Sequence, residues 1–175
     1  FNVLPGEKFL DPVQSPRNCN WFLLTLGCRR GLTFLEKQPE VDGKRLGIRG
    51  HSMGGNLTMY VAGSDTRVKA ASPSAGGTGF RTHSRYGLPP QIRNVKGDLE
   101  LFRRTMGYQF YAPRITAPLL HLGASNDFHG QMDATYATGA RVKKSVPQRF
   151  VFAPHFNHRF NKEQQIARIL WLDEH

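Results

Sequence analysis

Ser52 is the first residue whose surroundings indicate chemistry, because it lies between Gly50 and Gly54 in a Gly-x-Ser-x-Gly pattern. An apolar, strand-like run at 45–50 precedes it, and a helix-compatible segment at 56–62 follows. Strand, sharp turn and helix is the context of a nucleophile elbow, where glycines let strand and helix pass closely while the serine hydroxyl projects above a sheet. The bare pattern arises by chance in roughly one such chain in ten, so a serine that merely caps a helix is the alternative.

An acid and two histidines follow later strand ends. Asp127 comes just after the apolar run at 117–123, and His155 and His158 come after the run at 148–153. Since catalytic groups of a parallel sheet gather beyond the carboxyl ends of its strands, we expect these side chains to meet the serine. The order along the chain is then Ser, Asp, His. Asp127 as a plain turn residue is the alternative.

The histidine of the set stays open on spacing alone. His155 lies nearer the strand end, and His158 lies deeper in the following loop. His129 could lie over the site instead, whereas His121 alternates within a strand and is expected in the core.

Strands that alternate with helices have to position these groups, which predicts an α/β fold with a parallel sheet of about four strands covered on both faces. The expected helices are 16–38, 56–62, 99–106, about 131–143 and one opened by an Asn161/Gln164 capping box, and the expected strands are 45–50, 68–72, 117–123 and 148–153.

The segment 76–113 lacks a clear period and is expected to be an irregular, cap-like insertion. It carries five aromatic residues that either wall a substrate pocket or only pack: Phe80, Tyr86, Tyr108, Phe110 and Tyr111.

The 175 residues suit a single domain, 1–175. The formal net charge of +11 is scattered along the chain, and no nucleic-acid motif organises it, so specific nucleic-acid binding is not expected. No run is long and apolar enough for a membrane span. Cys19 and Cys28 fall in one expected helix roughly 13 Å apart, beyond disulfide reach. The compartment stays unassigned, and a first residue other than Met suggests processing or a fragment.

A family resemblance joins these features. The matching residues are Pro39-Glu40-Val41-Asp42, Arg45-Leu46-Gly47-Ile48, Gly50-His51-Ser52-Met53-Gly54-Gly55, Arg67-Val68-Lys69-Ala70-Ala71, Pro118-Leu119-Leu120 with Asp127, and Phe152, Pro154, His158 and Phe160. Over about residues 16–175 the chain resembles the C-terminal part of an α/β-hydrolase of the dienelactone-hydrolase and acetyl-xylan-esterase type. The resemblance implies a triad of Ser52, Asp127 and His158, with no metal or cofactor. Dienelactone hydrolases proper carry cysteine where this chain has Ser52, which favours ester hydrolysis.

The chain departs from the family pattern before its first expected helix, where the family places several strands and a loop that donates half of the oxyanion hole. The Met53 backbone N–H can supply one donor, and the second has no evident source. Since loss of one donor costs about 10²–10³ in turnover, the chain as given is expected to be a poor esterase. The strand at 45–50 is expected at a sheet edge, covered by a homodimer partner or by N-terminal protein outside this sequence.

Three functions follow as hypotheses. The first is a serine hydrolase of carboxylic esters, including acetyl esters of carbohydrates, with a small ester as substrate. The second is a peptidase on the same scaffold. The third is a non-catalytic binding module that keeps the elbow without a complete oxyanion site.

Overall fold

The structure is a computed structural model that describes residues 20–78 and 104–175. Within these residues a four-stranded sheet runs in the order β1-β2-β3-β4, and all neighbouring strands are parallel. The strands are β1 (Leu46–His51), β2 (Val68–Ser74), β3 (Leu119–Ala124) and β4 (Gln148–Ala153). Spatial order follows chain order, so β1 and β4 are the edges of the described sheet, and the edge position expected for β1 is confirmed.

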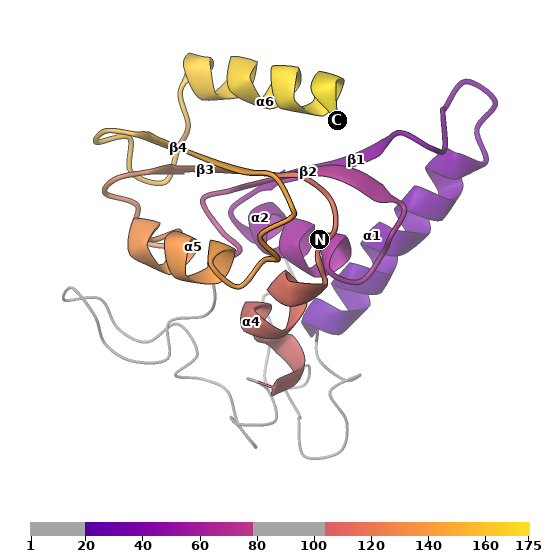
Figure 1. Cartoon of the computed structure of the whole chain (residues 1–175), viewed down its shortest axis with the longest axis horizontal. Helices are drawn as coiled ribbons and strands as arrows, with labels where there is room; N and C mark the ends of the chain where they lie inside the picture. Colours follow the sequence, from indigo (N-terminus) through magenta and orange to yellow (C-terminus); the bar gives the residue numbers. More distant parts are fainter. Residues whose placement is uncertain (1–19, 79–103) are drawn as a thin grey trace.

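Helices cover both faces of this sheet (Figure 1). They are α1 (Asn20–Glu36), α2 (Met53–Ala62), α4 (Tyr108–Tyr111), α5 (Met132–Gly139) and α6 (Lys162–Glu174), with a 3₁₀ turn η3 at Ala112–Arg114. α6 lies alone on one side of the sheet in Figure 1, and α2 and α5 lie on the other, with α1 beside α2. The expected α/β fold with a parallel sheet of about four strands is confirmed.

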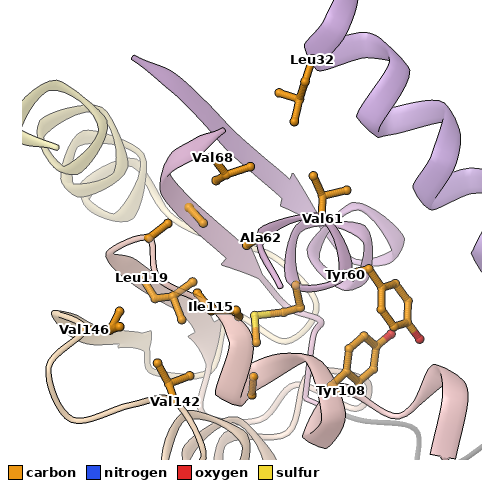
Figure 2. Packing of buried hydrophobic residues seen from close by; sticks show 14 of the residues in the cluster. Leu32, Tyr60, Val61, Ala62, Val68, Tyr108, Ile115, Leu119, Val142 and Val146 are labelled. Carbon is orange, nitrogen blue, oxygen red and sulfur yellow. The ribbon is translucent and has the colours of Figure 1, made fainter. Parts of the chain in front are cut away.

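The main core fills the space between the sheet and α2. Tyr60 of α2 stacks on Tyr108 with ring centroids 4.7 Å apart, and its hydroxyl donates to the Met106 carbonyl at 2.6 Å. Ile115 and Leu119 pack on the same side (Figure 2). This layer fixes α2, and with it the turn that precedes the helix.

A smaller core lies between the sheet and α6, where Trp171 packs against Leu120 and Leu122 of β3. The N-terminal end of α6 is fixed by Gln164, whose amide nitrogen donates to the carbonyls of Gly123 and Val151, both at 2.8 Å. Asn161 and Gln164 form the capping box predicted from the sequence. The loop that enters α6 is therefore anchored to β3 and β4.

The helices differ from expectation at four places. α1 ends at Glu36 rather than at 38. α2 begins at Met53 rather than 56, because the chain turns into helix directly after Ser52. α5 covers only Met132–Gly139 of the expected 131–143. Tyr108, Phe110 and Tyr111, expected within an irregular segment, lie in the short helix α4, since packing of Tyr108 and Tyr111 on Tyr60 orders it.

Some expectations concern residues that the structure does not describe. These are the helix start at 16, Cys19, Phe80, Tyr86, most of the expected helix 99–106 and most of the segment 76–113. The division of the chain into a single domain with a cap-like insertion therefore stays a prediction. In the described ranges, no helix has the length and apolar character needed to cross a membrane.

Candidate active site

Ser52 occupies the sharp turn between β1 and α2. Its backbone angles are φ 57° and ψ −116°, a region that residues with a side chain rarely adopt. The Ser52 N–H donates to the Ser74 carbonyl at 2.8 Å, and the Ser52 carbonyl accepts the Asn56 N–H at 3.1 Å. These two bonds hold the strained turn against β2 and against the first turn of α2.

Two glycines make room for this turn. A Cβ on Gly50 would run into the backbone of Gly54, and a Cβ on Gly55 would lie 2.6 Å from the Ser74 carbonyl oxygen. Close backbone approach thus requires glycine at positions 50 and 55, whereas a Cβ on Gly54 would meet no heavy atom within 4 Å. The prediction from the Gly-x-Ser-x-Gly pattern is confirmed for Gly50 and is wrong for Gly54.

Asp127 lies just past β3 with its side chain fully buried. Its Oδ1 accepts the backbone N–H groups of His129 at 2.8 Å and Gly130 at 3.0 Å. These donors fix the carboxylate in one orientation, toward the loop that follows β4.

His158 joins the other two side chains. Its Nδ1 lies 3.0 Å from Asp127 Oδ1 and 3.2 Å from Oδ2, and its Nε2 lies 2.7 Å from Ser52 Oγ. A carboxylate can only accept, so Nδ1 carries the proton of the neutral ring, and Nε2 is left to accept from the serine hydroxyl. The structure therefore brings Ser52, Asp127 and His158 together.

The other candidate histidines lie elsewhere. His155 is exposed, and its backbone adopts φ 57°. The His121 side chain is buried against Phe150, and burial lowers its pKa to about 4. The ring of His129 lies 5.4 Å from that of His158, edge to face, so it borders the site.

Sequence reasoning did not single out two residues that contact His158. The Phe128 ring lies 4.9 Å from the His158 ring and is 49% exposed, and the His51 ring lies 5.0 Å away on β1. Both directly adjoin a candidate residue in sequence, His51 before Ser52 and Phe128 after Asp127. That adjacency was the available signal.

The N-terminus of α2 faces the site. Met53 is the first residue of α2, so its N–H has no acceptor within the helix and lies at the positive end of the helix dipole. An oxygen that becomes negative beside Ser52 would meet this donor. The second donor that the sequence left without a source stays unassigned.

The geometry allows one kind of chemistry directly. The Ser52 hydroxyl lies 2.7 Å from an imidazole nitrogen that can take its proton, and the other imidazole nitrogen is hydrogen-bonded to a carboxylate, which is an arrangement in which a serine can act as a nucleophile.

Comparisons with known proteins identify the family and the fold of the chain. The sequence profile of the dienelactone hydrolase family matches residues 25–170. Acetyl esterase Axe7A of Xylanibacter ruminicola is 27% identical over 154 residues, which are 84% of this chain and 35% of that protein.

Solved structures share the fold. An acetyl xylan esterase from Paenibacillus sp. R4 has a TM-score of 0.74 at 22% identity, covering 98% of this chain and 58% of that one. An acylaminoacyl peptidase of Pyrococcus horikoshii has a TM-score of 0.62 at 23% identity, covering 79% of this chain and 23% of that one. The chain thus spans about a third of the length of the curated relative and less than two thirds of these structures.

Proposed function

Because the chain belongs to the dienelactone hydrolase family and has the α/β-hydrolase fold, we propose that it is a serine hydrolase of carboxylic esters. The observation that carries the proposal is the 2.7 Å approach of His158 Nε2 to Ser52 Oγ, with His158 Nδ1 on Asp127. The likeness to an acetyl esterase and to acetyl xylan esterases favours acetyl esters, including those of carbohydrates, as the substrate class.

In the first half of the reaction, Ser52 Oγ attacks the ester carbonyl while His158 Nε2 takes the hydroxyl proton. The carbonyl oxygen becomes negative and accepts the Met53 N–H. The imidazolium of His158, stabilised and oriented by Asp127, then gives the proton to the leaving alcohol. The products of this half are the free alcohol and an acyl group bonded to Ser52.

In the second half, water replaces the alcohol. His158 Nε2 takes a proton from the water as its oxygen attacks the acyl carbonyl, and the same proton returns to Ser52 Oγ as the acid leaves. No other side chain has to give or take a proton.

A fluorophosphonate probe and short-acyl p-nitrophenyl esters test this function. We expect the probe to label Ser52, detected by peptide mass, and we expect Ser52→Ala to abolish labelling and lower ester turnover by about 10⁴-fold or more. Ser64→Ala is the matched control, because the Ser64 hydroxyl donates to the Tyr60 carbonyl one helix turn away and its loss should leave labelling intact. Absence of labelling in a folded wild-type chain would contradict the proposed hydrolase function and favour a non-catalytic binding module.

A peptidase is the second candidate, because the fold is shared with acylaminoacyl peptidases. The two functions separate on paired substrates with the same acyl group. Cleavage of an N-acetylated peptide p-nitroanilide at a rate comparable to that of the p-nitrophenyl ester of the same N-acetylated peptide, lost in Ser52→Ala, would favour the peptidase.

A further inference from the structure

His51 makes two hydrogen-bond contacts that the catalytic steps do not use. It ends β1, and its ring is partly buried. Its Nε2 lies 3.2 Å from the backbone carbonyl oxygen of His158, and its Nδ1 lies 3.0 Å from Ser74 Oγ at the end of β2. One side chain therefore connects the two strand ends beside the elbow to the residue that bears the base.

The partners determine where the His51 proton sits. A carbonyl oxygen only accepts, so Nε2 carries the hydrogen and donates it to His158. The neutral ring then has a lone pair at Nδ1, which accepts the Ser74 hydroxyl. Ser74 is fully buried, so this hydroxyl has its acceptor in His51 rather than in solvent. A neutral His51 satisfies both contacts.

Aromatic packing holds the His51 ring in place. The Phe160 ring lies 5.1 Å from the His51 ring, edge to face. The guanidinium of Arg168, a residue of α6, lies over the Phe160 ring, 4.6 Å from its centroid. On another side lies the His158 ring at 5.0 Å. Because His51 contacts residues on both β2 and the loop into α6, the orientation of its ring depends on these two segments as well as on β1.

We propose that His51 is a positioning residue, which as the neutral Nε2–H tautomer holds the His158 carbonyl and so fixes the backbone from which the His158 ring reaches Ser52. This inference rests on the proposed function. It adds a residue whose effect on the reaction passes through His158.

The loop that bears His158 needs such an anchor. It contains His155 and Asn157 at φ 57° and 53°. Two bonds to the residues after β3 hold positions 155 and 157: Ser125 Oγ accepts the His155 N–H at 3.2 Å, and Asn126 Oδ1 accepts the Asn157 N–H at 2.7 Å. The His51 bond acts on residue 158 itself. A displacement of the base by 1 Å costs on the order of 100-fold in rate.

Neutrality of His51 also serves the reaction. When His158 becomes an imidazolium, a second cation with its ring 5.0 Å away would oppose that charge. Burial, the largest cause, lowers the pKa of His51, and the neighbouring His158 and Arg168 act in the same direction, while the bond to the His158 carbonyl and the charge of Asp127 act against it.

The experiment removes the hydrogen bonds of the His51 side chain and keeps an aromatic ring at this position. His51→Phe should lower kcat by between about tenfold and about 100-fold with KM within about twofold. His51→Gln, whose Nε2 can still donate to the His158 carbonyl, should recover most of that loss. His175→Phe is the matched control: the same substitution at the end of α6, where the ring packs edge to face on Trp171, should leave kcat unchanged.

A nuclear magnetic resonance readout does not depend on turnover. In the wild type, ¹⁵N shifts should show His51 protonated at Nε2 alone, and the His158 Nδ1 proton on Asp127 should be sharp and downfield. His51→Phe should broaden that proton, and Ser74→Ala, which keeps His51 but removes the donor to Nδ1, should do so more weakly. This series decides the proposal even if His51→Phe folds poorly.

Failure of the inference differs from failure of the proposed function. Probe labelling of Ser52 with an unchanged kcat and an unchanged His158 proton in His51→Phe would overturn the role of His51 alone. An unlabelled wild type would reject the hydrolase, and the His158 proton would still decide whether His51 positions that residue.

Discussion

The Asp127 carboxylate determines which ring nitrogen of His158 carries the proton. Its Oδ1 accepts two backbone N–H groups, so in Asp127→Asn the amide oxygen should stay there and the NH₂ group should take the place of Oδ2, 3.2 Å from His158 Nδ1. Nδ1 would then accept, Nε2 would carry the proton, and the base would be lost.

We therefore expect Asp127→Asn to lower ester kcat by about 10⁴-fold without unfolding the chain. Steady-state kinetics and a guanidinium midpoint measure both effects. Asp133→Asn is the control, since its Oδ1 can still accept the Ala134 N–H. A loss of less than tenfold in Asp127→Asn would contradict the role given to the carboxylate.

His121 links stability to pH. Burial lowers its pKa to about 4 from about 6.5 in the unfolded chain, so between these values the unfolded chain binds a proton that the folded chain does not. The free energy of unfolding should therefore be unaffected by His121 above about pH 6.5, and it should fall by about 3 kcal/mol as the pH is lowered from 6.5 to 4.

Urea midpoints at pH 7.5, 5.5 and 4.5 should show this slope in the wild type and a flatter one in His121→Leu. His155→Asn, which changes an exposed histidine, should keep the wild-type slope. Equal slopes for the wild type and His121→Leu would show that another group governs the acid sensitivity.

The junction of β1, α2 and β2 offers a matched pair of substitutions. A Cβ on Gly55 would lie 2.6 Å from the Ser74 carbonyl, the same oxygen that accepts the Ser52 N–H, whereas a Cβ on Gly54 meets no heavy atom within 4 Å.

Gly55→Ala should therefore cost about 1–3 kcal/mol of unfolding free energy and slow labelling of Ser52. Gly54→Ala, in the first turn of the same helix, should be neutral or stabilise by up to about 1 kcal/mol. Denaturant titration and probe kinetics on both variants check this, and equal destabilisation would refute the close approach as its cause.

The four strands followed from the sequence, because strands of a parallel sheet form apolar runs between turn residues. The edge position of β1 was also expected, but the order of β2, β3 and β4 across the sheet was not predicted. β4 has the bounds expected, and the α6 capping box has its two partners. The start of α2 and the helix α4 were not predicted from the sequence. The strained turn at Ser52 and the stacking of Tyr108 on Tyr60 determine the backbone there, and they override the local secondary-structure preference.

Within the site, the residue order predicted that Ser52, Asp127 and a histidine would meet. Spacing alone did not separate His155 from His158, and the family resemblance favoured His158. The difference depends on the loop path, with residues 155 and 157 at positive φ turning His158 back toward Ser52. The partners of His51 were beyond sequence reasoning, because Ser74 and the His158 carbonyl come from distant segments.

Across the whole molecule, the described sheet ends at β1. Arg49 is exposed on this edge strand, and the chain carries a net charge of +11. Charge on an edge discourages pairing with an identical copy. Coverage of this edge by a homodimer partner or by N-terminal protein stays a prediction.

Ser52 follows one edge strand, and His158 follows the other, 106 residues later. Parallel neighbours cannot pair through a tight hairpin, and sheets built from such distant pairings form slowly. During refolding, the serine should stay unreactive until β4 has docked. Stopped-flow fluorescence of Trp21 and Trp171 and pulse labelling with the probe at matched delays should show reactivity appearing only in the slowest phase. A chain arrested before that step would hold a complete elbow and an inert serine.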